Sequence, residues 1–404
     1  MTRAHVQPEW SAAEAVPPNS DAWRPTPIRQ FVLKVYSRCN LACDYCYVYR
    51  MADQTWRDQP LVMSRETLRL AADRIAEHAD RHRLSRVGVV LHGGEPLLAG
   101  PAFFAEAART LRERMPATTA VALTVQSNGV LLTRSMLDLL GEHDISVAVS
   151  IDGGPAGNDR HRRYPNGRGS YADVACGLEL LGSPAYRRLF AGLLCTVDLT
   201  QPPVATYAEL LRFRPPRMDF LLPLGNWSAP PPRRVADPAV TPYADWLGAV
   251  FDRWYDAPEQ ETELRLFREI IHLLLGGVSH FEGLGLTPAT VAVIETDGSL
   301  EQVDALKSAF SGAAATGLHL ATATMDDLLR HPAMLARQGG LAALADDCRN
   351  CAVREICGGG FYPHRYRIDT GFRNPSVYCP DLFALIRHIR TRVVRDLDRL
   401  TVAR

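Results

Sequence analysis

The chain lacks three features that each point to a definite class of protein. Its formal charge is zero, with 45 Lys and Arg residues against 45 Asp and Glu residues, which argues against a surface that binds nucleic acid. It has no run of about 18 apolar residues, so no transmembrane helix is expected. The first 27 residues lack the basic start and the apolar stretch of a signal peptide. We therefore expect a cytoplasmic protein whose partners include neither nucleic acid nor a membrane.

Disulfide bonds are not expected either. The chain has nine cysteines, an odd number, and in a reducing cytoplasm they stay free thiols or bind metal. The length of 404 residues and the 47% share of hydrophobic residues are those of an ordinary globular protein with one to three domains.

Apolar, β-branched runs alternate with helical patterns through the first half of the chain. The candidate strands are residues 28–36, 86–91, 120–125, 145–150, 189–197 and 218–224. The helical patterns between them cover residues 64–82, 101–115, 133–143, 171–182 and 206–213. Near-continuous apolar runs are typical of parallel strands that are covered on both faces. Distinctive polar loops directly follow the first four strands, which favours a partial (β/α)6 barrel over a doubly wound sheet.

Four regions follow from this pattern. Residues 1–27 form a Pro-rich extension, and residues 28–230 form the partial barrel. Residues 231–290 form a linker and bridging helices, with Thr241 and Pro242 starting a helix. Residues 291–404 begin with a hairpin that turns at Asp297 and Gly298, continue as a cysteine-bearing, loop-rich segment and end in a helix.

The segment "RCNLACDYCYVYR" carries three cysteines, Cys39, Cys43 and Cys46, in a C-x3-C-x2-C spacing. A structural zinc ion prefers four protein ligands, and no fourth is nearby in the sequence. Three thiolates and one vacancy suit a cubane iron–sulfur cluster with one iron open to another ligand. A zinc loop, or cysteines without a shared function, are the alternatives for this motif alone.

The motif follows the first strand directly and has Tyr47 beside its last cysteine. It resembles the cluster motif of the radical S-adenosylmethionine (radical SAM) superfamily. The tetrapeptide "GGEP", Gly93, Gly94, Glu95 and Pro96, follows the second strand and strengthens this resemblance, although by itself it could be an ordinary turn. The resemblance implies that three cysteines hold a [4Fe–4S] cluster whose open iron binds S-adenosylmethionine. One electron then releases a 5′-deoxyadenosyl radical.

Other loop residues match superfamily segments that surround the cofactor. The resemblance assigns cofactor binding to Tyr47, Gly93, Gly94, Glu95, Pro96, Ser127, Asn128, Ser150, Asp152 and Arg162. In related enzymes an arginine at the position of Arg162 reaches the cofactor carboxylate, and a buried carboxylate does need such a partner. A solvated loop is the alternative for Arg162. Two further cysteines, Cys176 and Cys195, lie in a helix and a strand pattern and are expected to be buried.

A second cysteine set lies near the carboxyl end. It comprises Cys348, Cys351, Cys357 and Cys379. This set resembles the SPASM extension of peptide-modifying radical SAM enzymes, which has seven cysteines and two auxiliary [4Fe–4S] clusters. The four cysteines correspond to the ligands of the second auxiliary cluster, with zinc as the alternative. Val303 and Phe361 stand where the pattern has cysteines of the first auxiliary cluster, so that cluster should be absent.

The resemblance also places Asp304 where SPASM enzymes have an aspartate that removes a proton from the substrate. A carboxylate near a barrel mouth is a reasonable proton acceptor. A structural role in the hairpin is the alternative for Asp304, and Glu295 and Asp297 are competing candidates for the base. The segment "HRY", residues 364–366, could contact substrate or support the cluster loop.

The segments "TDGSLEQVDALK", "CGGG" and "NPSVYCPDL" resemble the FxSxx-type (FxsB-like) subgroup. That subgroup joins an aromatic ring to a β-carbon of the same ribosomal precursor peptide and forms a cyclophane. The resemblance implies a peptide maturase that removes a Cβ hydrogen, with a precursor peptide and an electron donor protein as partners. About 27 residues precede the first strand, too few for a leader-binding module, so a separate leader-binding protein is a further expected partner.

Other functions remain open at this point. Within the superfamily, the alternatives are thioether formation and the oxidation of Ser or Cys to formylglycine, as in sulfatase maturation. Both usually accompany more auxiliary cysteines than this chain has. A peptide-binding scaffold without catalysis is the alternative from another class, and "GGEP" beside a three-cysteine motif argues against it.

Overall fold

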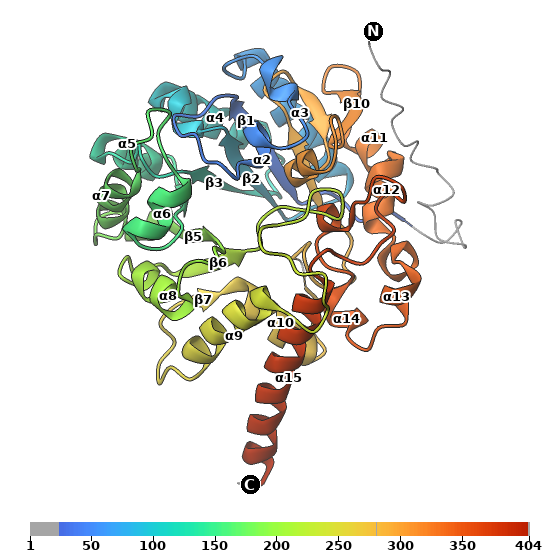
Figure 1. The fold of residues 1–404 in the computed structure, drawn as a ribbon. Coiled ribbons are helices and arrows are strands. Elements are labelled where there is room, and N and C mark those ends of the chain that lie inside the picture. The colour runs from blue at the N-terminus through green and yellow to red at the C-terminus, as the bar shows by residue number, and fades with distance from the viewer. Residues whose placement is uncertain (1–23, 280, 403–404) are drawn as a thin grey trace.

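A computed structural model of the chain describes residues 24–279 and 281–402 (Figure 1). Most of the extension at residues 1–27 therefore lies outside the described residues. Six strands form the centre of the sheet, each parallel to its neighbours. They are β1 (Gln30–Tyr36), β2 (Arg86–Gly93), β3 (Ala120–Ser127), β4 (Ile145–Ser150), β5 (Phe190–Thr196) and β6 (Arg217–Leu221). All six predicted strands are confirmed.

The helices that connect these strands follow the predicted pattern with one exception. They are α3 (Arg65–Arg81), α4 (Pro101–Arg114), α5 (Arg134–Glu142), α6 (Pro155–His161), α7 (Tyr171–Leu181) and α8 (Pro203–Leu211). Helix α6 was not predicted, because its seven residues carry too few apolar side chains to show a period. The hydroxyls of Ser64 and Thr133 accept hydrogen bonds from backbone amides in the first turns of α3 and α5.

The sheet extends beyond the six predicted strands on both sides. Its order is β10-β9-β8-β1-β2-β3-β4-β5-β6-β7. The added strands are β7 (Glu263–Leu264), β8 (Val291–Ile294), β9 (Ser299–Glu301) and β10 (Ala315–His319). The hairpin predicted at residues 290–306 is present, and Gly298 adopts φ +101° in its turn. Its first strand, β8, pairs in parallel with β1, so the region from residue 291 shares the barrel's sheet.

Short elements follow the hairpin and lead to a long final helix. They are the 3-10 helix η4 (Asp304–Ser308) and the helices α11 (Met325–Arg330), α12 (Pro332–Gln338), α13 (Asp346–Arg349), α14 (Arg354–Cys357) and α15 (Cys379–Val402). The bridging helices α9 (Pro242–Tyr255) and α10 (Arg265–Leu274) lie beside α15 (Figure 1). Buried side chains of α15, from Leu382 to Val393, belong to the same hydrophobic core as the barrel.

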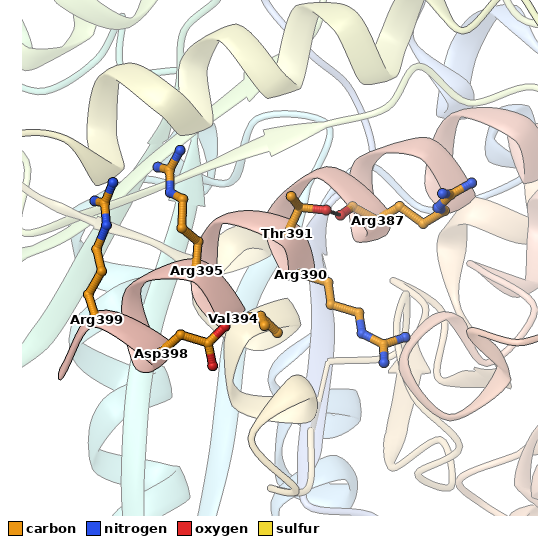
Figure 2. Close-up of a pocket in the computed structure, with 7 residues that line it drawn as sticks. All are labelled: Arg387, Arg390, Thr391, Val394, Arg395, Asp398 and Arg399. Atoms are coloured by element: carbon orange, nitrogen blue, oxygen red, sulfur yellow. Dashed lines mark hydrogen bonds between the residues drawn. The ribbon is translucent and has the colours of Figure 1, made fainter. Parts of the chain in front are cut away.

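The outer half of α15 projects away from the body of the protein (Figure 1). Figure 2 shows a shallow hollow on this part of the helix, where arginines such as Arg390 and Arg399 surround Val394. The hollow lies on the same helix as Cys379, but none of the cysteines and none of the candidate catalytic groups line it. Among the described helices, none is long and apolar enough to cross a membrane.

Candidate active site

The three cysteines of the first motif lie on the loop between β1 and the short helix α2 (Tyr47–Arg50), at the carboxyl edge of the sheet. The backbone amide of Leu41 donates to the Cys39 Sγ at 3.4 Å, and the Asn128 side-chain amide lies 3.7 Å from the same sulfur. Burial raises the pKa of Cys39 to about 12 and also raises that of Cys43. Such thiols become thiolates only when a cation replaces their protons.

The spacing of the thiols bears on which metal they could hold. Four thiolates around one zinc ion lie about 3.8 Å apart, since the Zn–S distance is about 2.3 Å and the geometry is tetrahedral. Among the described residues, two groups of three or more metal-binding side chains have ligand atoms within 4.8 Å of one another, and neither contains a cysteine. In the described residues, neither cysteine set brings three sulfurs within that distance of one another.

The "GGEP" loop packs tightly against the backbone that leads to the cysteines. A Cβ on Gly93 would collide with the carbonyl of Tyr36, and a Cβ on Gly94 would collide with the carbonyl of Arg38. These glycines are therefore required for the close approach of two loops, whatever they do for a ligand. The loop after β2 is held directly against the loop that carries the cluster motif.

Glu95 connects "GGEP" to the next loop. Its carboxylate accepts from the Ser127 hydroxyl at 2.9 Å and from the backbone amides of Leu97 and Asn128 at 3.0 and 2.7 Å. Burial raises the pKa of Glu95 to about 7, although these hydrogen bonds act in the opposite direction. The Asn128 side chain in turn donates to Asn40, next to Cys39. Glu95 and Ser127 thus hold the loops together, and their assignment to cofactor binding stays a prediction.

A third group of side chains joins the cysteine loop to the ends of β4 and β5. The Tyr45 hydroxyl donates to Asp152 and accepts from the Arg162 guanidinium at 2.9 Å. Asp152 also accepts from the backbone amide of Thr196 at 3.0 Å. The Nε of Arg162 is buried and has no hydrogen-bond partner in the described part of the chain. Burial raises the pKa of the nearby Cys43 thiol, and the positive charge of the Arg162 guanidinium offsets part of this rise.

The sequence predicted a role in cofactor binding for Tyr47 and none for Tyr45. Tyr45 lies directly before Cys46, and its hydrogen bonds to Asp152 and Arg162 give it a fixed place beside the cysteines. An aromatic residue between the second and third cysteines was a signal that could have found it. Ser150, at the end of β4, accepts from the Gln126 side chain at 3.0 Å.

The second cysteine set comes together from α13, α14 and the start of α15. Burial raises the pKa of Cys357 to about 12 and that of Cys379 to about 11, and the neighbouring thiols contribute to both shifts. Cys348 is within electrostatic range of Cys351, Cys357 and Cys379. The four cysteines from separate segments therefore form one cluster of thiols. Of the other two cysteines, Cys195 is buried as expected, whereas Cys176 is exposed on α7 and that prediction is wrong.

The three residues of "HRY" have different surroundings. The Arg365 guanidinium donates to the carbonyls of Gly358 and Gly360 at 2.6 and 2.7 Å, so it supports the loop after Cys357. Tyr366 packs against Phe372 in a small core of its own. His364 lies edge-on to Phe361, and both of its ring nitrogens are buried without a hydrogen-bond partner among the described residues.

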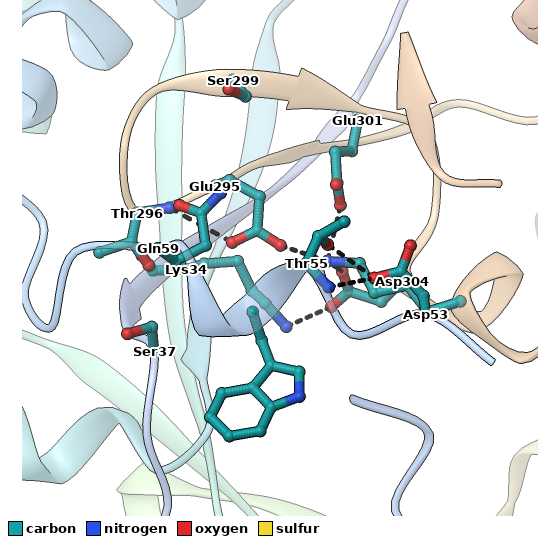
Figure 3. A network of polar contacts seen from close by, with 12 residues as sticks. Lys34, Ser37, Asp53, Thr55, Gln59, Glu295, Thr296, Ser299, Glu301 and Asp304 are labelled. Atoms are coloured by element: carbon teal, nitrogen blue, oxygen red, sulfur yellow. Dashed lines mark hydrogen bonds and ion pairs between the residues drawn. The ribbon is translucent and has the colours of Figure 1, made fainter. Parts of the chain in front are cut away.

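A network of buried charges lies between β1 and the hairpin (Figure 3). The Lys34 ammonium, from β1, donates to the Asp304 Oδ2 at 2.6 Å. The other carboxylate oxygen, Oδ1, is buried without a hydrogen-bond partner in the described residues and lies 3.9 Å from the Lys307 Nζ. Burial would raise the pKa of Asp304, but Lys34 and Lys307 outweigh it and lower the pKa to about 2.

Two more carboxylates complete this network. Lys307 forms ion pairs with Glu295 and, at 2.9 Å, with Glu301. Burial raises the pKa of Glu301 to about 8. Three buried carboxylates thus face two buried lysines, and the negative charges of Glu295 and Asp304 add to the effect of burial on the pKa of Glu301.

The competing candidates for the base are occupied. Glu295 is paired with Lys307, and Asp297 caps the hairpin turn by accepting from the backbone amide of Ser299 at 2.8 Å. Tyr47 is partly buried; burial raises its pKa, and the nearby Asp304 and Cys46 raise it further, so this ring lies between the charged network and the cysteine loop. His92, directly before "GGEP", is also partly buried here, and burial together with Lys34 lowers its pKa to about 4. Lys34 and His92 were not identified from the sequence.

Comparison with known proteins explains this arrangement. Residues 33–184 match the family model described as the radical SAM superfamily. The structure of native anSMEcpe with bound AdoMet is similar over 91% of this chain and 99% of its own, with a TM-score of 0.79 at 21% identity. This chain has the radical SAM fold.

Two curated proteins with related sequences are sulfatase-maturating enzymes. The cysteine-type anaerobic enzyme of Clostridium perfringens (strain 13 / Type A) is 25% identical over 284 residues, which are 69% of this chain and 74% of that protein. The serine-type anaerobic enzyme of Bacteroides thetaiotaomicron is 32% identical over 155 residues, which are 38% of this chain and 36% of that protein. The FxSxx-type subgroup predicted from the sequence is not distinguished by these matches.

The radical SAM fold implies a [4Fe–4S] cluster and S-adenosylmethionine, and the residues present fit both. Cys39, Cys43 and Cys46 supply three thiols on one loop, one fewer than a closed structural zinc site needs. The unpaired Nε of Arg162 is suited to an anionic group such as the carboxylate of the cofactor. The second cysteine set supplies four thiols and fits a closed auxiliary cluster.

Proposed function

We propose that this protein is a radical SAM enzyme that oxidises a side chain of a ribosomal precursor peptide. The cluster and S-adenosylmethionine supply a carbon radical that can remove a hydrogen atom from an unactivated Cβ–H bond. One observation carries the proposal: a buried carboxylate with one unpaired oxygen, Asp304, lies next to the cysteine loop. A peptide substrate is supported by the sulfatase-maturating relatives and by the similar structure of native anSMEcpe with bound AdoMet and Cp18Cys peptide.

Asp304 acts as the proton acceptor in this proposal. Lys34 holds its Oδ2 in place, which leaves Oδ1 to take the proton that the oxidised substrate releases. The low pKa of Asp304 keeps it ionised before the reaction, so it is ready to accept. Lys307 lies 3.9 Å from the same oxygen and stabilises the ionised form from the other side.

Cys348, Cys351, Cys357 and Cys379 would hold an auxiliary cluster, which would supply an electron acceptor with no iron open to substrate. The substrate loses two hydrogens in this proposal: one as a hydrogen atom, and the other as a proton to Asp304 with an electron to that acceptor. An electron donor protein would supply the electron that starts the reaction.

The finer product that we propose is a carbon–carbon crosslink between the Cβ and an aromatic ring of the same peptide, a cyclophane. The resemblance to the FxSxx-type subgroup supports it, as does the small number of auxiliary cysteines. Oxidation of Ser or Cys to formylglycine is the second candidate, and the sulfatase-maturating relatives favour it. Thioether formation has no observation of its own in this structure.

Co-expression with a short open reading frame from the neighbouring genes, chosen for its spaced aromatic residues, tests the proposal. Mass spectrometry of that peptide should show the loss of two hydrogens per modification, with fragmentation blocked between the joined residues. A hydrazide probe separates the two candidates, because formylglycine carries an aldehyde and a cyclophane does not. If the protein with intact clusters makes no 5′-deoxyadenosine from S-adenosylmethionine and dithionite, it is not a radical SAM enzyme and the scaffold alternative holds.

A further inference from the structure

A second group of potential metal ligands lies at the opposite edge of the sheet from the cysteine loop. His78 lies in the last turn of α3, and His82, four residues later, is the residue that caps the carboxyl end of this helix. Asp326, from α11, meets both rings. The first of these two helices belongs to the barrel, and the other follows the hairpin at residues 290–306. Nothing in the proposed reaction uses these three side chains.

The three ligand atoms converge on one point. The Asp326 Oδ1 lies 2.9 Å from the His78 Nδ1 and 2.8 Å from the His82 Nε2. All three atoms lie within 4.8 Å of one another, and His78 and Asp326 are buried. In a tetrahedral site with Zn–N distances of about 2.0 Å, neighbouring ligand atoms are about 3.3 Å apart. A shift of a few tenths of an ångström would therefore fit a zinc ion between them.

The hydrogen bonds in this cluster leave one buried ring nitrogen of His78 without a partner among the described residues. A neutral His78 that donates from Nδ1 to Asp326 has a lone pair on its buried Nε2, and that atom has no partner with good hydrogen-bond geometry in the described chain. The Nδ1 of the same ring lies 2.9 Å from the Asp326 Oδ1. A metal ion held by Nδ1 and this carboxylate would leave the ring's proton on Nε2, as is usual for an imidazole ligand.

We propose that His78, His82 and Asp326 bind a divalent transition-metal ion, with zinc as the expected ion. Two imidazoles and one carboxylate are a common ligand set for zinc, with a fourth position left for water. Arg81 contacts the other oxygen, Oδ2, at 3.0 Å and leaves Oδ1 to the metal. The ion would join α3 to α11 and so fasten the barrel to the region that follows the hairpin, which carries Asp304.

The protonation of the cluster is compatible with this site. Burial lowers the pKa of His78, so its ring is neutral at pH 7 and can act as a ligand. Burial would raise the pKa of Asp326, but hydrogen bonds from His82, Arg81 and His78 outweigh it and lower the pKa to about 2. Arg81 is the permanently charged group that contacts Asp326. Glu77 forms an ion pair with Arg81, and Asp327 also lies near this arginine.

The test is the zinc content of the full-length protein with its iron–sulfur clusters in place. The protein is dialysed anaerobically against zinc chloride, and bound zinc and iron are counted together by mass spectrometry. Wild type should hold about one zinc more per chain than His82→Gln, at equal iron content. The matched control is His143→Gln, which changes a histidine after α5 outside the cluster and should keep the zinc. His82 is partly exposed, so its substitution should leave the fold intact, and circular dichroism checks this.

Two further measurements make the result decisive. X-ray absorption at the zinc edge should show nitrogen and oxygen ligands, whereas zinc in a cysteine set would show sulfur. Zinc should also raise the Tm of wild type and of His143→Gln, and should leave that of Asp326→Asn unchanged. Equal zinc in wild type and His82→Gln, or a shell of sulfur alone, would overturn the proposal. None of these readouts requires peptide modification, so they are independent of the proposed function.

Discussion

At the scale of single residues, the two oxygens of Asp304 have different tasks. Lys34 holds one at 2.6 Å, and the other has no hydrogen-bond partner among the described residues. A carboxylate in this state is fixed in orientation and still able to accept a proton. That combination distinguishes Asp304 from the two competing candidates. Glu295 forms an ion pair with Lys307, and Asp297 accepts a hydrogen bond within the hairpin turn.

Replacing Asp304 with Asn should therefore block the second half of the reaction and spare the first. Asparagine keeps the shape but cannot take a proton, so peptide product should fall by roughly 10²- to 10⁴-fold, the range for loss of a general base. Formation of 5′-deoxyadenosine should continue, because it does not need this carboxylate. Chromatography of 5′-deoxyadenosine and of the modified peptide from the same reaction shows whether only the peptide product falls. If the two fall together, Asp304 has a structural role.

Glu301 gives a prediction with a defined pH window. Its pKa is about 8 in the folded protein and near 4.5 when unfolded, so its protonated form stabilises the fold below about pH 5 and this contribution is lost as the pH rises to 8. Glutamine resembles the protonated acid and does not titrate. The free energy of unfolding of Glu301→Gln relative to wild type should thus increase by up to about 1.4 kcal/mol per pH unit across this window.

The measurement is the Tm of both proteins between pH 5 and pH 8. The Tm of Glu301→Gln minus that of wild type should increase as the pH rises towards 8 and should stay constant at higher pH. A constant gap throughout would mean that Glu301 is already ionised at pH 5.

Arg162 should control the affinity for S-adenosylmethionine. Loss of one charge-assisted hydrogen bond costs about 1.5–3 kcal/mol, so Arg162→Gln should weaken binding by about 10- to 100-fold. Arg160 is a suitable control, because it lies two residues earlier on α6 and pairs with Asp198 at the surface. Equilibrium dialysis with the reconstituted protein gives both affinities. Equal affinity in wild type and Arg162→Gln would remove this residue from the cofactor site.

At the scale of elements, the position of the hairpin assembles the candidate site. Strand β8 pairs with β1, and the Thr296 hydroxyl donates to the carbonyl of Lys34 at 2.9 Å. Helix α2 and η4 are in contact, and the Asp53 amide donates to the carbonyl of Lys307 at 3.1 Å. A segment about 260 residues from the cysteine loop thereby places its carboxylate beside that loop.

The ion pair between β1 and η4 should contribute to stability. Lys34→Met would leave Asp304 buried with its remaining cation 3.9 Å away, and breaking a buried pair costs about 3–5 kcal/mol. A fall in Tm of several degrees is the expected result. The double variant Lys34→Met with Asp304→Leu removes both charges and should regain part of the loss. A double variant that is less stable than either single variant would contradict this explanation.

The predictability of these elements follows from their length and polarity. The six central strands are continuous apolar runs, and α3 to α5 have clear helical periods, so the sequence indicates them directly. Helix α6 has no such period. Strand β8 has four residues, "VAVI", which indicate a strand but not its neighbour, so the pairing with β1 was not foreseen. For the same reason Lys34 and His92 were missed, because only that pairing brings Asp304 to them.

At the scale of the whole molecule, two cysteine sets share one hydrophobic core. The core continues from the barrel through α9 and α10 to α15, whose first residue is Cys379. The final helix is thus tied at its start to the auxiliary site and along its inner half to the barrel. Loss of the auxiliary cluster should loosen the start of α15 without unfolding the barrel.

Iron content should reflect this division into two sites. Two [4Fe–4S] clusters give about eight irons per chain, and the double variant Cys351→Ser with Cys357→Ser should keep about four. Its circular dichroism spectrum should stay close to that of wild type, because the helices at these two cysteines, α13 and α14, have only four residues each. About twelve irons in wild type would mean that the first auxiliary cluster is present after all, despite Val303 and Phe361.

The most direct test of the account uses the electron paramagnetic resonance of the first cluster. The variant Cys351→Ser with Cys357→Ser, reduced anaerobically with dithionite, should show one [4Fe–4S] signal from the site of Cys39, Cys43 and Cys46. Addition of S-adenosylmethionine should change that signal, because the cofactor binds the iron that no cysteine holds. An unchanged spectrum, or zinc in place of iron at this loop, would contradict the account.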